Sequence, residues 1–225
     1  FTTLLKQAGK ACREECPEAK IILHTERATE TNVLTNFYDK MKNAGVDYDI
    51  IGLSYYPAWH KDIPTLEKAI NTLESRYADK KIMIVEVGYA YSWALENAAY
   101  DYKWKYPITE DGQKAFTDDL ITMLNKHESV NGLFWWWMEY NAYPYATTHM
   151  EGWWYAPLYD SKTGKPLLAM QSLKNFIVDS GIDNILSVPS SGSDTWYDIN
   201  GIPVGPAPTR PGIYIRHGKK MIISR

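Results

Sequence analysis

Lys81-Ile-Met-Ile-Val-Glu-Val-Gly88 is a short apolar run that ends in a carboxylate. Its length and its isoleucine and valine content predict a strand buried on both faces of a parallel sheet. Alternation along a strand predicts that Glu86 faces the same side as Ile82 and Ile84. Glu86 thus falls at the strand's carboxyl end, where a charge loses hydration unless donors or cations surround it. An ion pair or a catalytic role would account for it, and this stretch alone leaves both open.

Helical and strand-like segments alternate along most of the chain. Helices show apolar residues at helical spacing and strands are short β-rich runs, with Pro, Gly or a capping Thr at several boundaries. Helices are expected over 1–16, 31–44, 63–77, 109–124 and 166–179, and strands over 19–24, 48–57, 81–88 and 130–137. A helix followed by four strand–helix units predicts parallel α/β architecture with right-handed crossovers.

The pattern changes after residue 180. Residues 181–194 end in Ser187-Val-Pro-Ser-Ser-Gly-Ser-Asp194, a composition typical of a linker. Residues 195–225 contain short strand-like runs with tight turns at Asn200-Gly201 and His217-Gly218. We therefore expect a main domain over residues 1–180, a linker over 181–194 and a short β-rich appendage over 195–225.

Composition limits the classes of partner. Lys and Arg number 24 against 27 Asp and Glu, so the net charge is −3 and there is no basic field to hold nucleic acid. No apolar run reaches the length of a membrane span. The chain has 9 Trp and 17 Tyr but 5 Phe, which favours surfaces that stack sugar rings, although ordinary packing accounts for many of these rings singly. The cysteines and histidines do not have the spacing of a zinc site.

Side chains capable of chemistry stand at four successive strand ends. They are His24, Tyr55 with Tyr56, Glu86, and the tryptophans at 135–137. In parallel β/α folds the carboxyl ends of the strands share one face, where ligands bind. This grouping favours a catalytic role for Glu86 over a structural ion pair. His24 alone fits a core histidine as well as a site residue.

Four segments carry a resemblance to a known family. Residues 47–60 (Asp-Tyr-Asp-Ile-Ile-Gly-Leu-Ser-Tyr-Tyr-Pro-Ala-Trp-His) and 84–91 (Ile-Val-Glu-Val-Gly-Tyr-Ala-Tyr) resemble the sixth and seventh barrel strands of the arabinogalactan endo-β-1,4-galactanases, family 53 of the glycoside hydrolases. Residues 19–24 are similar to the fifth strand, and 132–137 with Glu151-Gly-Trp153 to the eighth. The likeness covers about residues 1–177. It implies the C-terminal half of a (β/α)8 TIM barrel with a short β-rich tail.

The resemblance also implies a reaction, the endo-hydrolysis of β-1,4-galactosidic bonds in (arabino)galactan side chains of pectin, with retention. Retention requires two carboxyl groups about 5–5.5 Å apart, a nucleophile and an acid/base. Glu86 matches the family's nucleophile. The acid/base glutamate of the family follows the fourth strand, upstream of the helix at Phe1. We therefore expect a truncated chain with one of the two catalytic carboxylates, inactive alone.

The same carry-over implies a set of substrate-binding residues. Tyr55 is expected to hold Glu86 by a hydrogen bond. Trp136 is expected to stack under the sugar ring at the cleavage point. Packing at a strand end is the competing interpretation of each. The residues expected to line the sugar cleft are His24, Tyr55, Trp59 and Trp136.

No cofactor or metal is expected. Some relatives carry an acidic calcium loop after the nucleophile strand, but residues 92–101 offer only Glu96, Asn97 and Asp101 as oxygen ligands. The expected partner is a galactan polysaccharide, bound by a protein that is monomeric at full length. The tail resembles β appendages of secreted bacterial glycosidases, which predicts a secreted, periplasmic or cell-surface location, although this chain contains no signal peptide. Another retaining β-polysaccharide hydrolase and a non-catalytic carbohydrate-binding protein remain as alternatives.

Overall fold

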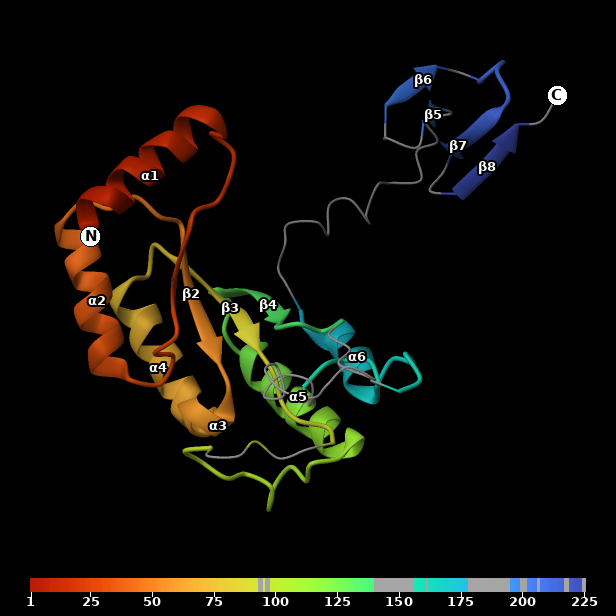
Figure 1. Ribbon diagram of the computed structural model, residues 1–225. Coiled ribbons are helices and arrows are strands. Elements are labelled where there is room, and N and C mark those ends of the chain that lie inside the picture. Colours follow the sequence, from red (N-terminus) through yellow and green to blue (C-terminus); the bar gives the residue numbers. More distant parts are fainter. Residues whose placement is uncertain are drawn as a thin grey trace. The chain divides into compact units, whose positions relative to one another are not determined.

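The computed structural model describes residues 1–92, 95, 98–139, 156–160, 162–177, 195–198, 202–205, 207–216 and 219–223. The chain divides into two compact units, Phe1–Asp179 and Ser180–Arg225. The larger unit is a parallel sheet flanked by helices, and the smaller one is a set of short antiparallel strands (Figure 1). In the described part of the chain, no helix combines the length and the apolar character needed to cross a membrane.

The larger unit repeats a strand and a helix. Its four parallel strands lie in the sheet in chain order, and each connection between them contains at least one helix. The predicted α/β class is therefore confirmed. The strands are β1 (Ile22–Thr25), β2 (Ile50–Tyr55), β3 (Lys81–Val87) and β4 (Val130–Trp135), and the helices are α1 (Thr2–Glu15), α2 (Thr31–Asn43), α3 (Pro57–His60), α4 (Ile63–Arg76), α5 (Glu110–Leu124), α6 (Leu168–Ser172) and the 3₁₀ turn η1 (Leu173–Asn175).

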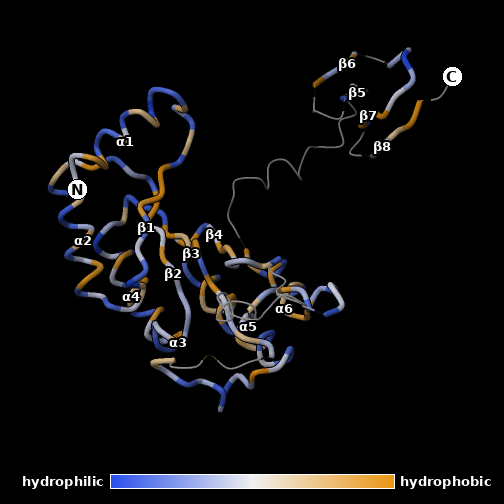
Figure 2. The backbone as a smooth tube through the Cα atoms, viewed as in Figure 1, coloured by the Kyte–Doolittle hydropathy of each residue, from blue (hydrophilic) through white to orange (hydrophobic). Residues whose placement is uncertain are grey.

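The core lies between the sheet and the helices. Ile51, Leu53 and Ile84 of the strands are fully buried in one cluster with apolar residues of α2, α4 and α5, such as Leu66 and Phe116. Figure 2 shows hydrophobic and hydrophilic residues alternating along α2 and α4, as expected of helices with one face on a core. Each such side chain contributes about 1.5–3 kcal/mol by its burial.

The opposite side of the sheet is packed closely at one glycine of β2. A Cβ atom added to Gly52 would lie 2.7 Å from Cγ2 of Ile22 and 3.3 Å from Cγ1 of Val85. Because Gly52 has no side chain, the side chains of Ile22 and Val85 on the neighbouring strands can occupy this space. Gly132 of β4 has the same relation to Met83, whose Sδ atom would lie 2.8 Å from an added Cβ.

A β-bulge near the end of β3 corrects the prediction for Glu86. Along β2 the partners run Leu53↔Ile84 and then Ser54↔Glu86, so β3 contains one extra residue, Val85. The pairing with β4 shifts in the same interval, between Ile84 and Val87. Because of this residue, Val87 and not Glu86 joins Ile84 in the buried core, and Glu86 stays half-buried. The prediction that Glu86 faces the side of Ile82 and Ile84 was wrong.

The last predicted helix, over residues 166–179, is also shorter than expected. It consists of α6 and η1, and Phe176 has extended backbone. The amide of Asn125 donates from Nδ2 to the carbonyl of Asn175 (2.9 Å) and accepts at Oδ1 from the N–H of Ile177 (2.9 Å). The carbonyl of Asn175 and the N–H of Ile177 therefore bond to the side chain of Asn125, just after α5, and not to backbone groups of a continuing helix.

The smaller unit contains β5 (Trp196–Tyr197), β6 (Pro203–Gly205), β7 (Gly212–Arg216) and β8 (Lys219–Ile223) in the antiparallel order β6-β5-β7-β8. Trp196 is buried, with the ring of Tyr214 at 6.3 Å and the guanidinium of Arg216 at 5.1 Å from its ring centroid. The predicted linker at 181–194 and the turns at 200–201 and 217–218 lie outside the described residues.

Candidate active site

Glu86 lies at the carboxyl end of β3, between the ends of two neighbouring strands. On one side, Ser54 of β2 is its partner in the sheet. On the other side, the backbone N–H of Trp136 donates to the carbonyl of Val87 (2.9 Å), which places the segment after β4 against the end of β3. The carboxylate, the serine and the tryptophan segment therefore meet at one edge, where parallel sheets bind ligands.

Tyr56 holds the carboxylate. Its hydroxyl donates a hydrogen bond to Oε2 of Glu86, and the two oxygens are 2.9 Å apart. Tyr56 is 8% exposed, whereas Glu86 is half-buried. The bond occupies one carboxylate oxygen with a neutral donor and fixes the direction in which the other oxygen points.

Tyr55 does not have the predicted role. Its ring is fully buried, 6.3 Å from the ring of Phe116, and its hydroxyl donates to the carbonyl of Lys61 (3.0 Å). Burial raises the pKa of Tyr55 well above its usual value, so the phenol stays a donor. The prediction that Tyr55 hydrogen-bonds Glu86 was wrong, because consecutive residues face opposite sides of a strand and Tyr56 is the one directed at the carboxylate.

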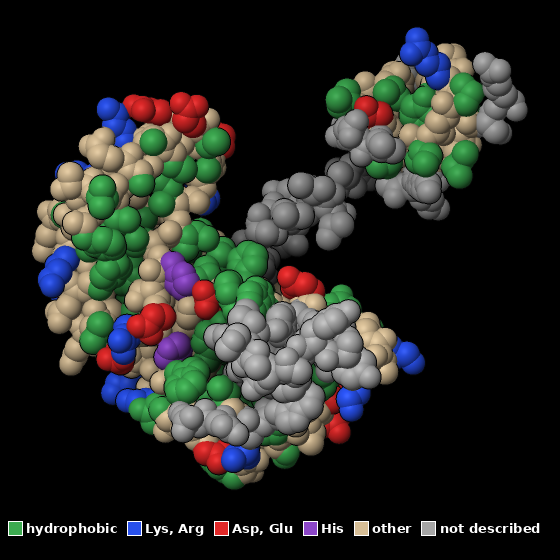
Figure 3. Space-filling view, viewed as in Figure 1, with side chains coloured by type: hydrophobic (Ala, Val, Ile, Leu, Met, Phe, Trp, Pro, Cys, Tyr) green, Lys and Arg blue, Asp and Glu red, His purple; other side chains and the backbone are tan. Residues whose placement is uncertain are grey.

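His24 joins the site through Ser54. Nε2 of His24 lies 2.7 Å from Oγ of Ser54, a buried serine. Since Ser54 is the strand partner of Glu86, the histidine belongs to the same row of residues as the carboxylate. Figure 3 shows histidine and acidic side chains gathered beside hydrophobic side chains on the face in view. This arrangement supports the site interpretation of His24 over the core interpretation.

Two tryptophans of the predicted cleft are accessible. Trp136 is 36% exposed and stacks on Trp137, with ring centroids 5.7 Å apart and planes 11° apart. Trp59, on α3, is 41% exposed. Trp135 is instead buried, and its indole donates to the carbonyl of Ala156 (2.7 Å). The flat, accessible face of an indole is the surface on which a sugar ring stacks.

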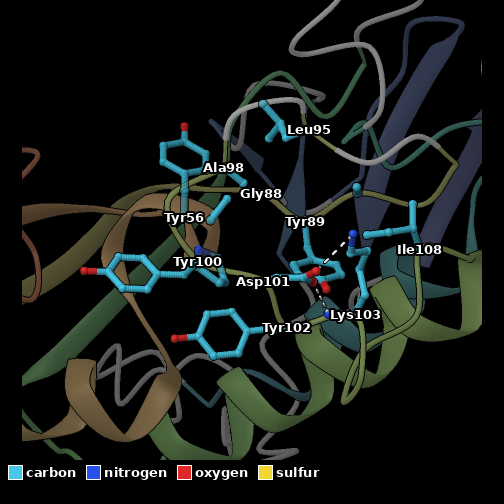
Figure 4. Close-up of a pocket in the computed structure, with 13 residues that line it drawn as sticks. Tyr56, Gly88, Tyr89, Leu95, Ala98, Tyr100, Asp101, Tyr102, Lys103 and Ile108 are labelled. Atoms are coloured by element: carbon cyan, nitrogen blue, oxygen red, sulfur yellow. Dashed lines mark hydrogen bonds and ion pairs between the residues drawn. The ribbon is translucent and has the colours of Figure 1, made fainter.

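A cavity of about 220 Å³ opens next to Tyr56. It is lined by the turn at 56–58, by residues 88–90 and by side chains of the following loop, namely Leu95, Ala98, Tyr100, Asp101, Tyr102, Lys103 and Ile108. Glu86 is not among its lining residues. Figure 4 shows Tyr100 and Tyr102 on one side of this cavity and Ile108 on the other. The N–H of Tyr100 donates to the carbonyl of Ala58 (3.1 Å), so the loop after β3 is tied to α3.

Within the described residues, no group of three or more His, Cys, Asp or Glu side chains is arranged to hold a metal ion. Of the oxygen ligands considered for calcium, Glu96 and Asn97 lie outside the described residues, and Asp101 binds the backbone and the ammonium of Lys103. The Glu151-Gly-Trp153 motif also lies outside the described residues.

Comparison with known families gives a direct match. The model of glycosyl hydrolase family 53 matches residues 1–173, most of the larger unit. The chain belongs to glycosyl hydrolase family 53. The resemblance inferred from the sequence is thereby confirmed, and so is the fold, the second half of a (β/α)8 barrel.

Individual relatives match different shares of the chain. An uncharacterized protein in the bgaB 5′ region of Niallia circulans is 29% identical over 198 residues, which are 82% of this chain and 51% of that protein. The arabinogalactan endo-β-1,4-galactanase of Cellvibrio japonicus is 33% identical over 146 residues, 59% of this chain and 38% of that enzyme. The Ignisphaera aggregans GH53 catalytic domain superimposes with a TM-score of 0.66 and 31% identity, over 78% of this chain and 51% of that domain. The chain thus spans about half or less of the length of these relatives.

Sequence reasoning missed the contacts that three residues of the candidate site make. Tyr56 was placed at the strand end, but the bond to Glu86 was assigned to its neighbour. Ser54 and His60 were given no role of their own. Alternation from the buried Leu53 through Ser54 and Tyr55 to Tyr56 was the signal that could have found Tyr56. Ser54 contacts His24 across two strands, and His60 accepts from the backbone N–H of Tyr56 within a single turn. Neither contact is marked by a pattern in the sequence.

Proposed function

We propose that this chain carries the nucleophile of a retaining endo-β-1,4-galactanase. Glu86 is the nucleophile, and the observation that carries the proposal is its hydrogen bond from Tyr56 at the end of β3. A structural ion pair is the competing explanation for a strand-end carboxylate. Glu86 has instead a neutral phenol donor at 2.9 Å and strand neighbours that bear a histidine and an accessible indole.

The geometry supports a two-step displacement. With Oε2 held by Tyr56, Oε1 of Glu86 attacks the anomeric carbon while the glycosidic C–O bond breaks, and a second carboxyl group protonates the leaving oxygen. Water then attacks the same carbon, the bond to Glu86 breaks, and the second carboxylate takes the proton from water. Two inversions give net retention. We assign no residue of this chain to the second carboxyl group.

The other residues position the sugar. Trp136 offers an indole face to the ring at the cleavage point, and His24, held by Ser54, offers a polar edge to its hydroxyl groups. Both contacts fit a galactose unit of a β-1,4-galactan, such as the side chains of pectin. Because such a polymer is too large to enter a cell, the proposal includes a protein that acts outside the cytoplasm, and we expect it to act as a monomer.

The test uses the protein expressed from its complete gene, with reducing ends released from β-1,4-galactan as the readout. Glu86→Gln should lower kcat by about 10⁴-fold or more, because it removes the group that forms the intermediate. The 225-residue chain by itself should give no turnover. Xylan and mannan serve as comparison substrates. Activity of Glu86→Gln near that of the unmodified protein would overturn the assignment.

A further inference from the structure

His60, the last residue of the one-turn helix α3, is linked to Glu86 through Tyr56. The backbone N–H of Tyr56, the residue before α3, donates to Nδ1 of His60 (3.1 Å), and the backbone N–H of His60 donates to the carbonyl of Tyr56 (2.8 Å). His60 therefore holds both backbone groups of the tyrosine whose hydroxyl binds Glu86. Its side chain is only 12% exposed.

The direction of this contact fixes the tautomer of His60. A backbone N–H can only donate, so Nδ1 must accept and carry no proton. The proton of the neutral ring then lies on Nε2, which faces Oε2 of Glu26 at 3.7 Å. If Nδ1 gained a proton, two N–H groups would point at each other and the contact with Tyr56 would be lost.

We propose that His60 is a positioning residue for Glu86 that acts through Tyr56, and that its protonation in weak acid releases Tyr56 from the carboxylate. The chain of contacts has two links, His60 Nδ1 to the Tyr56 backbone at 3.1 Å and the Tyr56 hydroxyl to Glu86 at 2.9 Å. His60 does not touch the reacting atoms in this account. The inference rests on the proposed function of Glu86.

Some neighbours of His60 lower its pKa and others raise it. Burial lowers the pKa of His60 below its usual value of 6.5, and Arg27 acts in the same direction. Glu26 and Glu30, from the segment after β1, act in the opposite direction. Tyr56 is the aromatic neighbour, with ring centroids 6.1 Å apart. The ring of His60 thus stays neutral to a lower pH than a free histidine does, and Glu26 is the carboxylate that most opposes this lowering of its pKa.

Two variants of similar shape separate the hydrogen bond from packing. His60→Asn places Oδ1 where Nδ1 lies and cannot titrate, and His60→Leu has nearly the same shape as the asparagine without an acceptor. In the protein from the complete gene, the leucine variant should lose about tenfold in kcat, with KM changed by about twofold or less. The asparagine variant should recover most of kcat and keep it at acidic pH values where the unmodified protein loses activity.

Glu26 supplies an independent arm. Glu26→Gln removes a group that raises the pKa of His60, so the acid limb of the kcat profile should move to lower pH. Glu30→Gln is the matched control with a smaller expected shift. Both carboxylates pair with Arg27, Glu26 at 2.6 Å and Glu30 at 2.8 Å, but Glu26 also lies 3.7 Å from Nε2 of His60 and raises the pKa of His60 more than Glu30 does. Equal shifts for the two variants, or none for either, would contradict the role of His60.

The amide signal of Tyr56 in ¹⁵N NMR gives a readout that does not depend on activity. The chemical shift of this amide should change as His60 titrates and stay constant with pH in His60→Asn.

The outcomes for the two proposals are distinguishable. If Glu86→Gln kept full activity, the proposed function would fail, and the amide signal would still show whether His60 accepts from the Tyr56 backbone. If Glu86→Gln were inactive while His60→Leu kept the kcat and pH profile of the unmodified protein, only the present inference would be overturned. Should the leucine variant not fold, the asparagine pH profile and the amide signal decide the question.

Discussion

The hydroxyl of Tyr56 and Oε2 of Glu86 lie 2.9 Å apart, and this hydrogen bond joins the end of β2 to the end of β3. Two local features produce it. The extra residue Val85 keeps Glu86 off the core side of β3, and the buried Tyr55 leaves its successor on the other side of β2. A half-buried carboxylate at a strand end is thereby given a phenol donor at one of its oxygens.

The first prediction separates the two consecutive tyrosines. Tyr56→Phe removes a hydrogen bond to a charged group, worth about 1.5–3 kcal/mol, so kcat should fall roughly 10- to 100-fold with little loss of stability. Tyr55→Phe removes the bond to the Lys61 carbonyl and should lower the free energy of unfolding by about 1–2 kcal/mol while kcat stays close to that of the unmodified protein. Kinetics on galactan and urea unfolding check both. The reverse pattern would restore Tyr55 as the partner of Glu86.

The second prediction concerns the accessible indoles. Trp136→Ala should lower kcat/KM by about tenfold or more, because the stacking face at the cleavage point is lost. Trp104, 79% exposed on the loop after β3, provides the matched control, and Trp104→Ala should change kcat/KM by less than about twofold. Equal effects of the two substitutions on galactan kinetics would argue against a specific role for Trp136.

The third prediction concerns Ser54. Ser54→Ala removes the hydroxyl 2.7 Å from Nε2 of His24 and frees the imidazole to rotate. We expect kcat/KM to fall by about three- to tenfold, and His24→Ala to fall further, since it removes the ring itself. If the double variant is no worse than His24→Ala, the serine acts through the histidine. Additive effects in this double-mutant cycle would contradict that link.

The fourth prediction concerns stability. Gln113 of α5 is fully buried, and its Nε2 donates to the carbonyls of Tyr89 (2.9 Å) and Pro157 (3.0 Å). Gln113→Ala should lower the free energy of unfolding by about 2–3 kcal/mol, because it leaves two carbonyls without their donor. Thermal or urea unfolding measures this. A loss below about 0.5 kcal/mol would show that the link from Gln113 to the Tyr89 and Pro157 carbonyls adds little to stability.

The fifth prediction is a pH dependence of stability. The pKa of His60 is lowered in the folded protein, so the unfolded chain binds more protons as pH falls. The neutral ring contributes to the free energy of unfolding in full above pH 6.5. This contribution is lost as the pH falls from 6.5 through the lowered pKa of His60. The free energy of unfolding should therefore fall more steeply in this range for the unmodified protein than for His60→Asn. Parallel curves would contradict the lowered pKa.

Much of the fold followed from local sequence signals. The apolar spacing of α2, α4 and α5 and the short β-rich runs depend on periodicity, which a single chain displays directly. The shortened last helix did not follow, because Asn125 binds the backbone of Asn175 and Ile177 from fifty residues away. Such a contact competes with helix formation and leaves no mark in the segment itself.

The candidate site was predictable to the level of strand ends. Glu86, His24 and Trp136 were found there because parallel strands share one edge for their carboxyl ends. The direction of each side chain depends on register, and one extra residue in β3 reverses it. The family resemblance assigned the hydrogen bond with Glu86 to Tyr55, whereas the register of the folded strands gives it to Tyr56.

Covalent trapping tests the central claim most directly. The protein from the complete gene is incubated with a 2-deoxy-2-fluoro-β-galactobioside bearing a good leaving group, and the labelled peptide is identified by mass spectrometry. The account predicts one fluorogalactosyl-containing adduct, on the peptide that contains Glu86, and no adduct in Glu86→Gln. An adduct on another residue, formed as the enzyme loses activity, would contradict it.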